Sequence, residues 1–352
     1  MTDFTPLALP PAGRVGFALV GLGAYALEQI LPNLPATRRC RLAAVVSGDP
    51  DKARAVARAH GLAERHVYSY ETFDRIAEDE TVEVVYLILP NTMHRAWTER
   101  SFAAGKHVLC EKPMAATVAD CEAMIAAGQA AGRKLMIGYR AQLDPYNLRA
   151  IDLVRGEGAQ IGTPRIAVGN HGRILDLADR RDGWRAKRDL AGGGSLFDIG
   201  IYALNGVRYL LGEEPTEVTA RFAPGSGRPE VEVEEGVAWS MQFPSGAVAS
   251  CTSSYLTEGA NRLQVFGDAG TVTLDPATKY YERRLILTRG RTHERIVIPN
   301  VNQFAAMLDE MAEAVQDDRK PKTPGLEGMR DVRIMTAIYK SAESGQRVSL
   351  GR

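Results

Sequence analysis

Short apolar runs alternate with amphipathic, alanine-rich stretches through the first 140 residues, and this alternation constrains the fold more than any other feature. The runs are almost continuously apolar, as in strands buried on both faces of a sheet. Strands separated by helices of this length form parallel sheets with right-handed crossovers. We therefore predict strands at residues 15–20, 42–47, 84–89, 107–110 and 134–138, and helices at 24–31, 51–60, 70–77, 95–104 and 118–131.

The pattern changes after about residue 140, where short, partly alternating segments are separated by turn residues, as in antiparallel sheets. Strands are predicted at 165–168, 217–222, 237–243, 247–254, 262–266, 271–274, 284–288 and 294–298, and helices at 145–155, 194–211, 302–317 and 328–343. The length of 352 residues suits two domains. The predicted fold class is α/β, with a Rossmann doubly wound parallel sheet in residues 1–138 and an α+β domain in 139–352 that contains a large open, mainly antiparallel sheet.

A glycine-rich turn follows the first predicted strand and opens the first predicted helix. Gly21 permits a tight turn, Gly23 lets backbone approach a pyrophosphate, and Ala26 stands where a small residue lets the helix pack closely. Glycine turns between strands and helices are common, so a purely structural turn is the alternative. The place of this turn after the first strand favours a dinucleotide, and we assign to it the loop residues Gly21, Leu22, Gly23, Ala24 and Tyr25.

The end of the second predicted strand bears on the choice between NADP and NAD. A cofactor without a 2′-phosphate usually meets an acidic side chain there. Ser47 and Gly48 occupy this position, and Lys52 lies in the first turn of the next helix. Because a hydroxyl and an ammonium group suit a phosphate, NADP is favoured. Asp49 comes two residues late, and its alternative role is the N-cap of that helix.

Two further strand ends carry polar residues, and such ends face the ligand crevice of a parallel sheet. Glu111 and Lys112 follow the fourth predicted strand, where Lys112 can place positive charge beside a hydroxyl being oxidised and lower the pKa of a partner acid. A surface loop is the alternative for this pair. The turn after the third strand lies where a nicotinamide ribose would pass, although an ordinary strand-to-helix loop fits equally; its residues are Leu89, Pro90, Asn91 and His94.

Composition argues against several classes of protein. Lysine plus arginine equals aspartate plus glutamate at 43 each, so the charge gives no sign of a nucleic-acid or anionic-membrane partner. The four cysteines have no disulfide-scaffold or metal-site spacing and fit free thiols in a reducing compartment. No segment near the N-terminus resembles a signal peptide, and no window approaches a membrane span of about 18 apolar residues. We therefore expect a cytoplasmic protein without a metal site.

Several motifs together resemble the Gfo/Idh/MocA oxidoreductase family and, within it, the glucose–fructose and aldose–aldose oxidoreductases. They are the glycine loop, Glu111-Lys112-Pro113 and the run from Asp198 to Tyr202, joined by similar runs at 110–114, 135–140, 190–196, 209–215 and 275–278. The similarity extends from about residue 13 to the C-terminus. The resemblance implies an NADP-dependent aldose oxidoreductase whose catalytic residues are Lys112, Asp198 and Tyr202.

In this resemblance, Lys112 bridges the substrate hydroxyl and the nicotinamide ribose, Asp198 hydrogen-bonds the substrate, and Tyr202 is the acid/base. A tyrosine, with an ordinary pKa of about 10, is a poor base at neutral pH unless a cation stabilises its phenolate. Lys112 is expected to be that cation. From the residues alone, a helix-capping Asp198 and a Tyr202 packed in the core remain the alternatives.

The resemblance also assigns the remaining pocket residues. Trp184 and Arg185 match a pair near the nicotinamide, and Tyr139 and Arg140 are expected to line the sugar pocket. Beyond the glycine loop, the residues expected around the cofactor are Ser47, Gly48, Lys52, Tyr70, Leu89, Pro90, Asn91, His94, Glu111, Lys112, Arg140, Trp184 and Arg185. Those expected around the sugar are Lys112, Tyr139, Asp198, Tyr202 and Tyr280.

We expect a ping-pong reaction on tightly bound NADP, in which a cyclic aldose is oxidised at C1 to a lactone and a second sugar takes the hydride. The alternatives are a conventional dehydrogenase with exchangeable cofactor and a non-catalytic NADP-binding sensor.

About a dozen residues precede the first strand, so we expect the long N-terminal arm of secreted relatives to be missing or reduced, and cofactor retention to depend on local contacts. A homo-oligomer, with a dimer favoured, would cover the open sheet.

Overall fold

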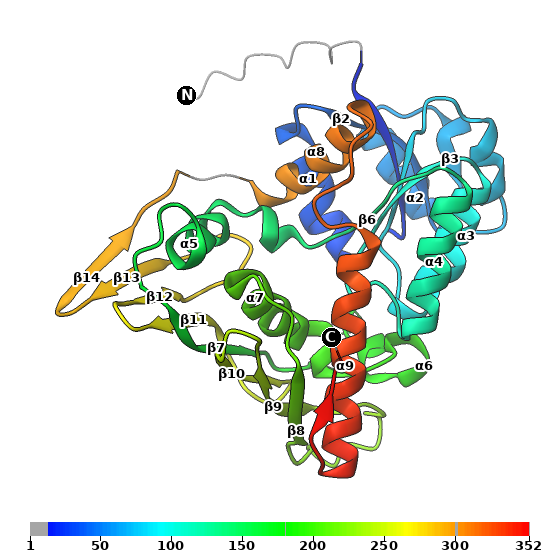
Figure 1. Ribbon diagram of the computed structural model, residues 1–352. Helices are drawn as coiled ribbons and strands as arrows, with labels where there is room; N and C mark the ends of the chain where they lie inside the picture. Colours follow the sequence, from blue (N-terminus) through cyan, green and yellow to red (C-terminus); the bar gives the residue numbers. More distant parts are fainter. Residues whose placement is uncertain (1–12, 180, 300–301, 352) are drawn as a thin grey trace.

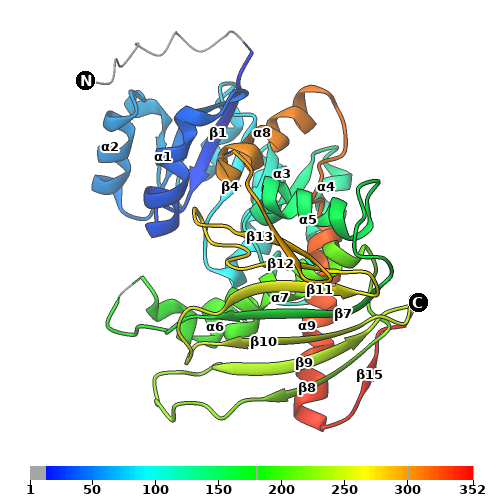
Figure 2. The same ribbon diagram turned by 90° about the vertical axis from the view of Figure 1, so that its left-hand side faces the viewer.

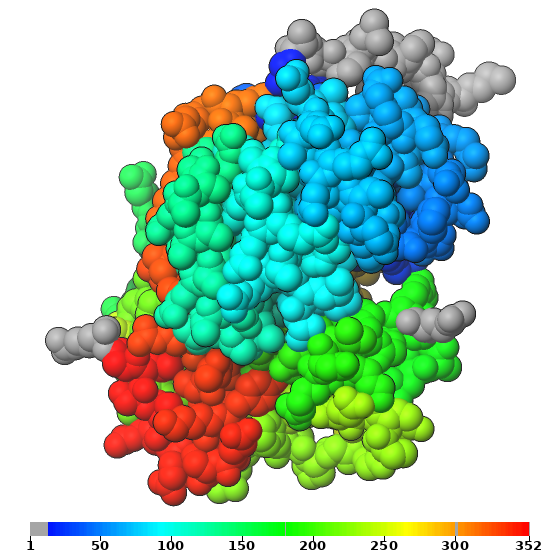
Figure 3. Space-filling model, turned by 90° about the vertical axis from the view of Figure 1, so that its right-hand side faces the viewer, coloured from blue at the N-terminus to red at the C-terminus, as the bar shows by residue number. Residues whose placement is uncertain are grey.

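The computed structural model describes residues 13–179, 181–299 and 302–351. Most of the segment on which the expectations about a leader and an N-terminal arm rest lies outside the described residues. Figure 1 shows two sheets, one in the N-terminal part of the chain and one in the C-terminal part. In the space-filling view of Figure 3, the blue and cyan N-terminal residues fill the upper part together with an orange C-terminal segment, and green, yellow-green and red residues fill the lower part.

Six parallel strands form the first sheet, in the order β3-β2-β1-β4-β5-β6. The strand order reverses between β1 and β4, which places the ligand crevice outside the carboxyl ends of the strands. β1 is buried along its whole length, as its continuous apolar run predicts. The predicted doubly wound sheet is therefore confirmed, and its strands are β1 (Val15–Val20), β2 (Cys40–Val46), β3 (Val67–Tyr68), β4 (Val84–Leu87), β5 (His107–Cys110) and β6 (Leu135–Ile137).

The connections of this sheet differ from the prediction in one place. The helix predicted at 70–77 is the 3₁₀ helix η4 (Phe73–Glu78), because its two fully buried side chains, Phe73 and Ile76, are three residues apart and so match the 3₁₀ period. The two-residue strand β3 was not predicted, since it is too short to show a period. The other connections contain η1 (Ala26–Ile30), α1 (Leu31–Asn33), α2 (Pro50–Ala59), α3 (His94–Ala103) and α4 (Val118–Ala130), with the short 3₁₀ helices η2 (Leu34–Ala36), η3 (Glu64–His66) and η5 (Asn91–Met93).

Nine strands form the second sheet, in the order β14-β13-β12-β11-β7-β10-β9-β8-β15. Neighbouring strands are antiparallel except β7 and β10, which run parallel, so the mainly antiparallel sheet is confirmed. The strands are β7 (Pro164–Gly172), β8 (Glu217–Phe222), β9 (Gly236–Gln242), β10 (Val248–Ser254), β11 (Asn261–Gly267), β12 (Thr271–Leu274), β13 (Leu285–Arg289), β14 (Thr292–Ile296) and the unpredicted β15 (Val348–Ser349).

One face of the second sheet is packed under helices, and the other is bare among the described residues (Figure 2). Along β9, Trp239 and Met241 are buried, whereas Ala238 and Ser240 on the opposite face are exposed. This alternation is the pattern of an antiparallel sheet with one solvated face. The covering helices are α5 (Pro145–Arg155), α7 (Ile201–Leu211) and α9 (Gly325–Ser344).

A helix from the C-terminal part of the chain completes the core of the first sheet. α8 (Gln303–Gln316) buries Phe304, Met307, Leu308 and Met311 against the apolar side chains of β1. In Figure 1, α8 lies beside α1 and β2, far from the antiparallel sheet. The two parts of the chain are therefore joined by a shared core as well as by the connection after β6.

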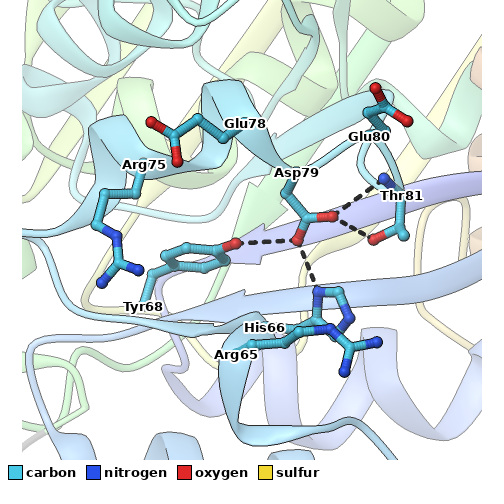
Figure 4. Close-up of a pocket in the computed structure, with 8 residues that line it drawn as sticks. All are labelled: Arg65, His66, Tyr68, Arg75, Glu78, Asp79, Glu80 and Thr81. Atoms are coloured by element: carbon cyan, nitrogen blue, oxygen red, sulfur yellow. Dashed lines mark hydrogen bonds and ion pairs between the residues drawn. The ribbon is translucent and has the colours of Figure 1, made fainter.

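A cluster of hydrogen-bonded polar side chains lies at the edge of the first sheet, at a hollow of about 350 Å³ (Figure 4). The Asp79 carboxylate accepts hydrogen bonds from the Tyr68 hydroxyl (2.9 Å), from the backbone N–H (3.0 Å) and hydroxyl of Thr81, and contacts Nδ1 of His66 at 2.7 Å. Burial alone would raise the pKa of Asp79, but these hydrogen bonds outweigh it and lower the pKa to about 2. This cluster holds the segment between β3 and β4 in place.

Replacing Asp79 with Asn is expected to lower the free energy of unfolding at pH 7 by about 2 kcal/mol, because the folded state holds the carboxylate about two pH units below its unfolded pKa of about 3.9. Since the folded pKa is depressed, this stabilisation is complete above about pH 4 and is lost as the pH falls through about 2. Urea unfolding at neutral and acidic pH measures it. The exposed neighbour provides the control, because Glu78→Gln should change little; equal effects of the two variants at pH 7 would contradict the assignment.

Candidate active site

A cleft of about 1230 Å³ lies between the carboxyl ends of the first sheet and the second part of the chain. It brings together nearly all the residues that the sequence assigned to cofactor and sugar. The lining residues among them are Gly21, Leu22, Gly23, Ala24, Tyr25, Ser47, Gly48, Lys52, Tyr70, Leu89, Pro90, Asn91, Glu111, Lys112, Arg140, Trp184, Arg185, Asp198, Tyr202 and Tyr280. Two assigned residues, His94 and Tyr139, lie outside it.

The glycine loop has the geometry of a phosphate cradle. Gly21 has φ +93°, and a Cβ there would lie 2.3 Å from the carbonyl oxygen of Ile88, so only glycine fits. A Cβ at Gly23 would meet nothing within 4 Å, and the backbone at this point is open to the cleft. The loop leads directly into η1, whose N-terminus favours an anion. These features fit a dinucleotide pyrophosphate.

Residues after β2 form the next side of the cleft. Asp49 is the N-cap of α2 and accepts a hydrogen bond from the backbone N–H of Lys52 (3.0 Å), which confirms its alternative role. The Ser47 hydroxyl accepts from the backbone N–H of Asp49 (3.1 Å), and the Lys52 ammonium lies 3.8 Å from the Asp49 carboxylate. Ser47 and Lys52 thus stand together at the cleft with a hydroxyl and a cation.

The structure corrects the assignment of His94 and Tyr139. His94 is fully buried at the start of α3, and its ring nitrogens contact the carbonyl oxygens of Leu89 and Pro113, each at 3.0 Å. It therefore ties together two loops that line the cleft, and burial lowers its pKa. Tyr139 is also buried, and its hydroxyl donates to Asp331 on α9 at 2.7 Å, away from the cleft. His94 therefore joins two loops that line the cleft and Tyr139 joins its own segment to α9, but neither residue lines the cleft itself.

Asp198 lies in η8 (Leu196–Gly200), the turn that leads into α7, and two arginines hold its carboxylate. Arg173 donates to one oxygen from Nε (3.1 Å) and Nη2 (3.0 Å), and Arg185 donates to the other from Nε (3.2 Å). Burial would raise the pKa of Asp198, but Arg185, Arg173 and Lys112 together hold it well below its usual range. Because the side chain binds arginines, the helix-capping alternative is wrong.

Tyr202 lies one turn further along, with cations on two sides. Nη2 of Arg140 donates to the Tyr202 hydroxyl at 3.1 Å. Nζ of Lys112 lies 4.5 Å from the centre of the Tyr202 ring and donates instead to the backbone carbonyl of Asp198 at 2.7 Å. The cation that is hydrogen-bonded to the phenolic oxygen is therefore Arg140, while Lys112, the cation expected from the sequence, lies over the ring.

Several residues that line the cleft were not predicted from the sequence. His171 at the end of β7 is buried, with its ring stacked on Tyr202 at 5.7 Å between centres and Nε2 at 2.8 Å from the Thr278 hydroxyl. Burial, together with Arg140 and Lys112, lowers the pKa of His171 to about 3, so the ring is neutral. Asp182 binds both Arg173 and Arg185. The only sequence signal was the cluster of polar residues that ends β7.

The start of the helix carrying Asp198 and Tyr202 is held by a buried carboxylate. Glu234 accepts hydrogen bonds from the backbone N–H groups of Gly194 (2.8 Å) and Leu196 (2.9 Å) and from the hydroxyl of Tyr339 (2.8 Å). A carboxylate at a helix N-terminus is favourable because it meets unpaired N–H groups and the positive end of the dipole.

Within the described residues, no cluster of three or more metal-ligating side chains occurs, and no helix there is long and apolar enough to cross a membrane.

Comparison with known proteins identifies the family. Residues 15–139 match the family model of the oxidoreductase family's NAD-binding Rossmann fold, and residues 157–350 match that of its C-terminal alpha/beta domain. This chain belongs to the Gfo/Idh/MocA oxidoreductase family. The cleft therefore lies in an oxidoreductase, at the crevice of its NAD(P)-binding Rossmann sheet.

Relatives of this Gfo/Idh/MocA member resemble it over nearly their whole length. The aldose-aldose oxidoreductase from Caulobacter crescentus, solved in complex with glycerol, is 45% identical with a TM-score of 0.92, covering 96% of this chain and 99% of that one. The D-xylose 1-dehydrogenase [NADP(+)] of Haloarcula marismortui is 32% identical over 96% of this chain and 93% of its own length. The 1,5-anhydro-D-fructose reductase of Ensifer adhaerens is 26% identical over 94% and 97%, respectively.

Proposed function

We propose that this enzyme is an NADP-dependent sugar oxidoreductase. It oxidises a cyclic aldose at C1 to a lactone and passes the hydride to the carbonyl of a second sugar, an aldose or a ketose, in a ping-pong reaction on tightly bound NADP. The observation that carries the proposal is the convergence of Lys112, Asp198 and Tyr202 at the crevice of the Rossmann sheet. The activities for which the two relatives at 45% and 32% identity are named, on aldoses and on D-xylose with NADP, support the substrate class and the cofactor.

The residues around the cleft suit NADP. The backbone at Gly21 and Gly23 and the start of η1 would receive the pyrophosphate, and Ser47 and Lys52 the 2′-phosphate. Trp184 lines the same cleft and is assigned to the nicotinamide. When bound, NADP supplies the hydride acceptor of one half-reaction and the donor of the other. This assigns residues 1–138 to cofactor binding and 139–352 to substrate binding and oligomerisation.

Side chains of the protein transfer the proton that accompanies each hydride transfer. Tyr202 takes the proton of the anomeric hydroxyl as the C1 hydride departs, and returns a proton to the carbonyl oxygen of the second sugar. Lys112, whose Nζ lies 4.5 Å from the centre of the Tyr202 ring, would place a positive charge near that oxygen. The Asp198 carboxylate stays ionised and accepts a hydrogen bond from a sugar hydroxyl, which fixes the ring relative to Tyr202.

Cofactor retention is supported by two contacts across the cleft that start from neighbouring residues of η1. Glu28 pairs with Arg181 at 2.8 Å, and Gln29 accepts from the hydroxyl of Tyr281 at 3.1 Å. Both partners belong to the second part of the chain, so η1 is linked to it directly beside the glycine loop. These contacts oppose opening of the cleft without any need for an N-terminal arm.

Protein purified without added nucleotide should release about one equivalent of NADP or NADPH on denaturation, measured by absorbance and mass. Arg181→Ala should speed loss of the nucleotide by up to about fivefold, since an exposed ion pair contributes up to about 1 kcal/mol. Arg165→Ala, which breaks the exposed pair with Asp268 elsewhere, is the matched control. If the dialysed protein contains no nucleotide and turns over only when free NADP is added, the enzyme is a conventional dehydrogenase instead.

Replacing Tyr202 with Phe should lower kcat by about 10²–10⁴, the usual contribution of general acid–base catalysis, with nucleotide content nearly unchanged. The readout is lactone formed from one aldose in the presence of a second sugar. Tyr146→Phe removes a hydroxyl from α5, outside the cleft, and serves as the control. Unchanged turnover in the Tyr202 variant would remove the acid/base assignment, and a protein that binds NADP but oxidises no sugar would favour the sensor.

The bare face of the second sheet supports a homodimer. Ile166 on β7 and Val248 on β10 are adjacent on this face and are 47% and 42% exposed. Face-to-face packing of two sheets would bury them.

The four cysteines are buried and free, which supports a reducing, cytoplasmic location.

Light scattering should give twice the mass of one chain, and the double variant Ile166→Arg with Val248→Arg should give the mass of one. The charge reversal of the exposed Arg65→Glu at the far edge of the first sheet should leave the dimer intact. A single-chain mass for the unmodified protein would contradict the dimer.

A further inference from the structure

Three arginines of the described chain are buried, and one of them differs from the others. Arg208 pairs with the buried carboxylate of Asp331, and Arg283 lies 2.8 Å from that of Asp144. Arg140 is 3% exposed, and within the described residues it forms no ion pair with an aspartate or glutamate. Burying a guanidinium without a counter-ion costs several kcal/mol, so this position calls for an explanation.

The hydrogen-bonding partners of Arg140 are formally neutral. Nη1 donates to the side-chain oxygen of Gln303 at 2.5 Å, and Nη2 donates to the carbonyl oxygen of Thr278 at 2.8 Å and to the hydroxyl of Tyr202 at 3.1 Å. Nε has no partner. The guanidinium also lies over the rings of Tyr202 (5.0 Å) and Tyr280 (4.6 Å). Among these acceptors, only the tyrosine hydroxyl gains a negative charge by losing a proton.

We propose that Arg140 is a further catalytic residue, the counter-cation that stabilises the Tyr202 phenolate in the proton-accepting state of the enzyme. The proposal rests on the proposed function, in which Tyr202 is the acid/base. It gives the two cations separate tasks, because Arg140 is at the phenolic oxygen whereas Lys112 lies over the ring and is bonded to the carbonyl of Asp198.

The other charged and titratable groups around Tyr202 do not replace Arg140. From the end of β7, His171 is neutral, because its pKa is lowered to about 3. From the segment after β12, Tyr280 is kept protonated by burial, which raises its pKa. From the preceding turn, the Asp198 carboxylate is already occupied by two arginines. From the glycine loop, Tyr25 is kept protonated by burial, which raises its pKa. From the end of β5, Glu111 is buried, which raises its pKa, and it accepts hydrogen bonds from the Tyr86 hydroxyl and from the backbone N–H of Lys112. The cations in contact with Tyr202 are Arg140, at its hydroxyl, and Lys112, over its ring.

The proton and hydride movements balance with Arg140 in this role. In the oxidative half-reaction, the sugar O–H bond breaks and its proton joins the Tyr202 phenolate, while the C1–H bond breaks and its hydrogen leaves with the electron pair as hydride, for which bound NADP⁺ would be the acceptor. In the reductive half-reaction, the second sugar carbonyl gains the hydride at carbon and the Tyr202 proton at oxygen. The phenolate returns to the hydrogen bond with Arg140, so the protein ends in the state in which it began.

The test is a titration of Tyr202 that needs no sugar. Absorbance at the phenolate band is followed against pH in the holoenzyme and in the same protein carrying Tyr202→Phe, and the difference reports Tyr202 alone. Arg140→Met, which removes the charge, should move the midpoint upward by about one pH unit or more, and Arg140→Lys by less. The exposed Arg65→Met, at the hollow of Figure 4, should not move it.

A second readout follows the reduction of bound NADP by an aldose in a single turnover at a series of pH values. The part of the pH–rate profile that disappears in the Tyr202→Phe variant reports Tyr202. In the Arg140→Met variant, this part of the profile should move to higher pH by the same amount as the absorbance midpoint. A folded Arg140→Met protein with an unmoved midpoint overturns the proposal. If Arg140→Met does not fold, Arg140→Lys decides it, since an unmoved midpoint there, with the aldose reaction unchanged, overturns it too. A moved midpoint in a protein that oxidises no sugar supports the role of Arg140 and defeats the proposed function instead.

Discussion

The carboxylate of Glu234 at the start of the α7 segment is the contact on which the geometry of the site depends. It receives two backbone N–H groups, those of Gly194 and Leu196, from the turn that feeds Asp198 and then Tyr202 into the cleft. Burial of Glu234 raises its pKa, and the hydrogen bonds from the turn and from Tyr339 oppose that rise. Because helix residues one turn apart share a face, fixing this end orients both side chains at once.

Electrostatics divide the cleft into two regions with different properties. Around Asp198, two carboxylates and two guanidiniums form a closed set, since Asp182 and Asp198 each bind both Arg173 and Arg185. Such a set is already neutral and changes little during a reaction. Around Tyr202, by contrast, two cations converge on a group that is neutral when protonated. A charge created by proton transfer would therefore be accommodated at Tyr202 rather than at Asp198, which supports the proposed roles, with the carboxylate orienting the sugar and the phenol exchanging the proton.

Most strands, most helices and the glycine loop could be predicted from the sequence because each depends on local signals. Continuous apolar runs marked β1 and β5 to the residue, and the glycines marked the crevice. Partnerships between distant segments left no such signal. The hydrogen bond between Arg140 and Tyr202 spans 62 positions, and that between Tyr139 and Asp331 spans 192. Tyr139 and Arg140 are adjacent in sequence yet face opposite ways, toward α9 and toward the cleft, which only the packed structure determines.

The packing of α8 against the first sheet bears on how far the cleft can open. Phe304 and Met307 of this helix lie in the core formed by β1, while Gln303 at its start holds Arg140 and, through its amide group, the carbonyl oxygen of Tyr280 (2.8 Å). A rigid-body separation of the two parts would therefore have to break a buried apolar core as well as surface contacts, and such a core resists opening far more than isolated ion pairs do. The contacts of Arg181 and Tyr281 with η1 are exposed and individually weak, so an opening of the cleft would break them first, while the buried core keeps Arg140 and Tyr202 fixed relative to the glycine loop.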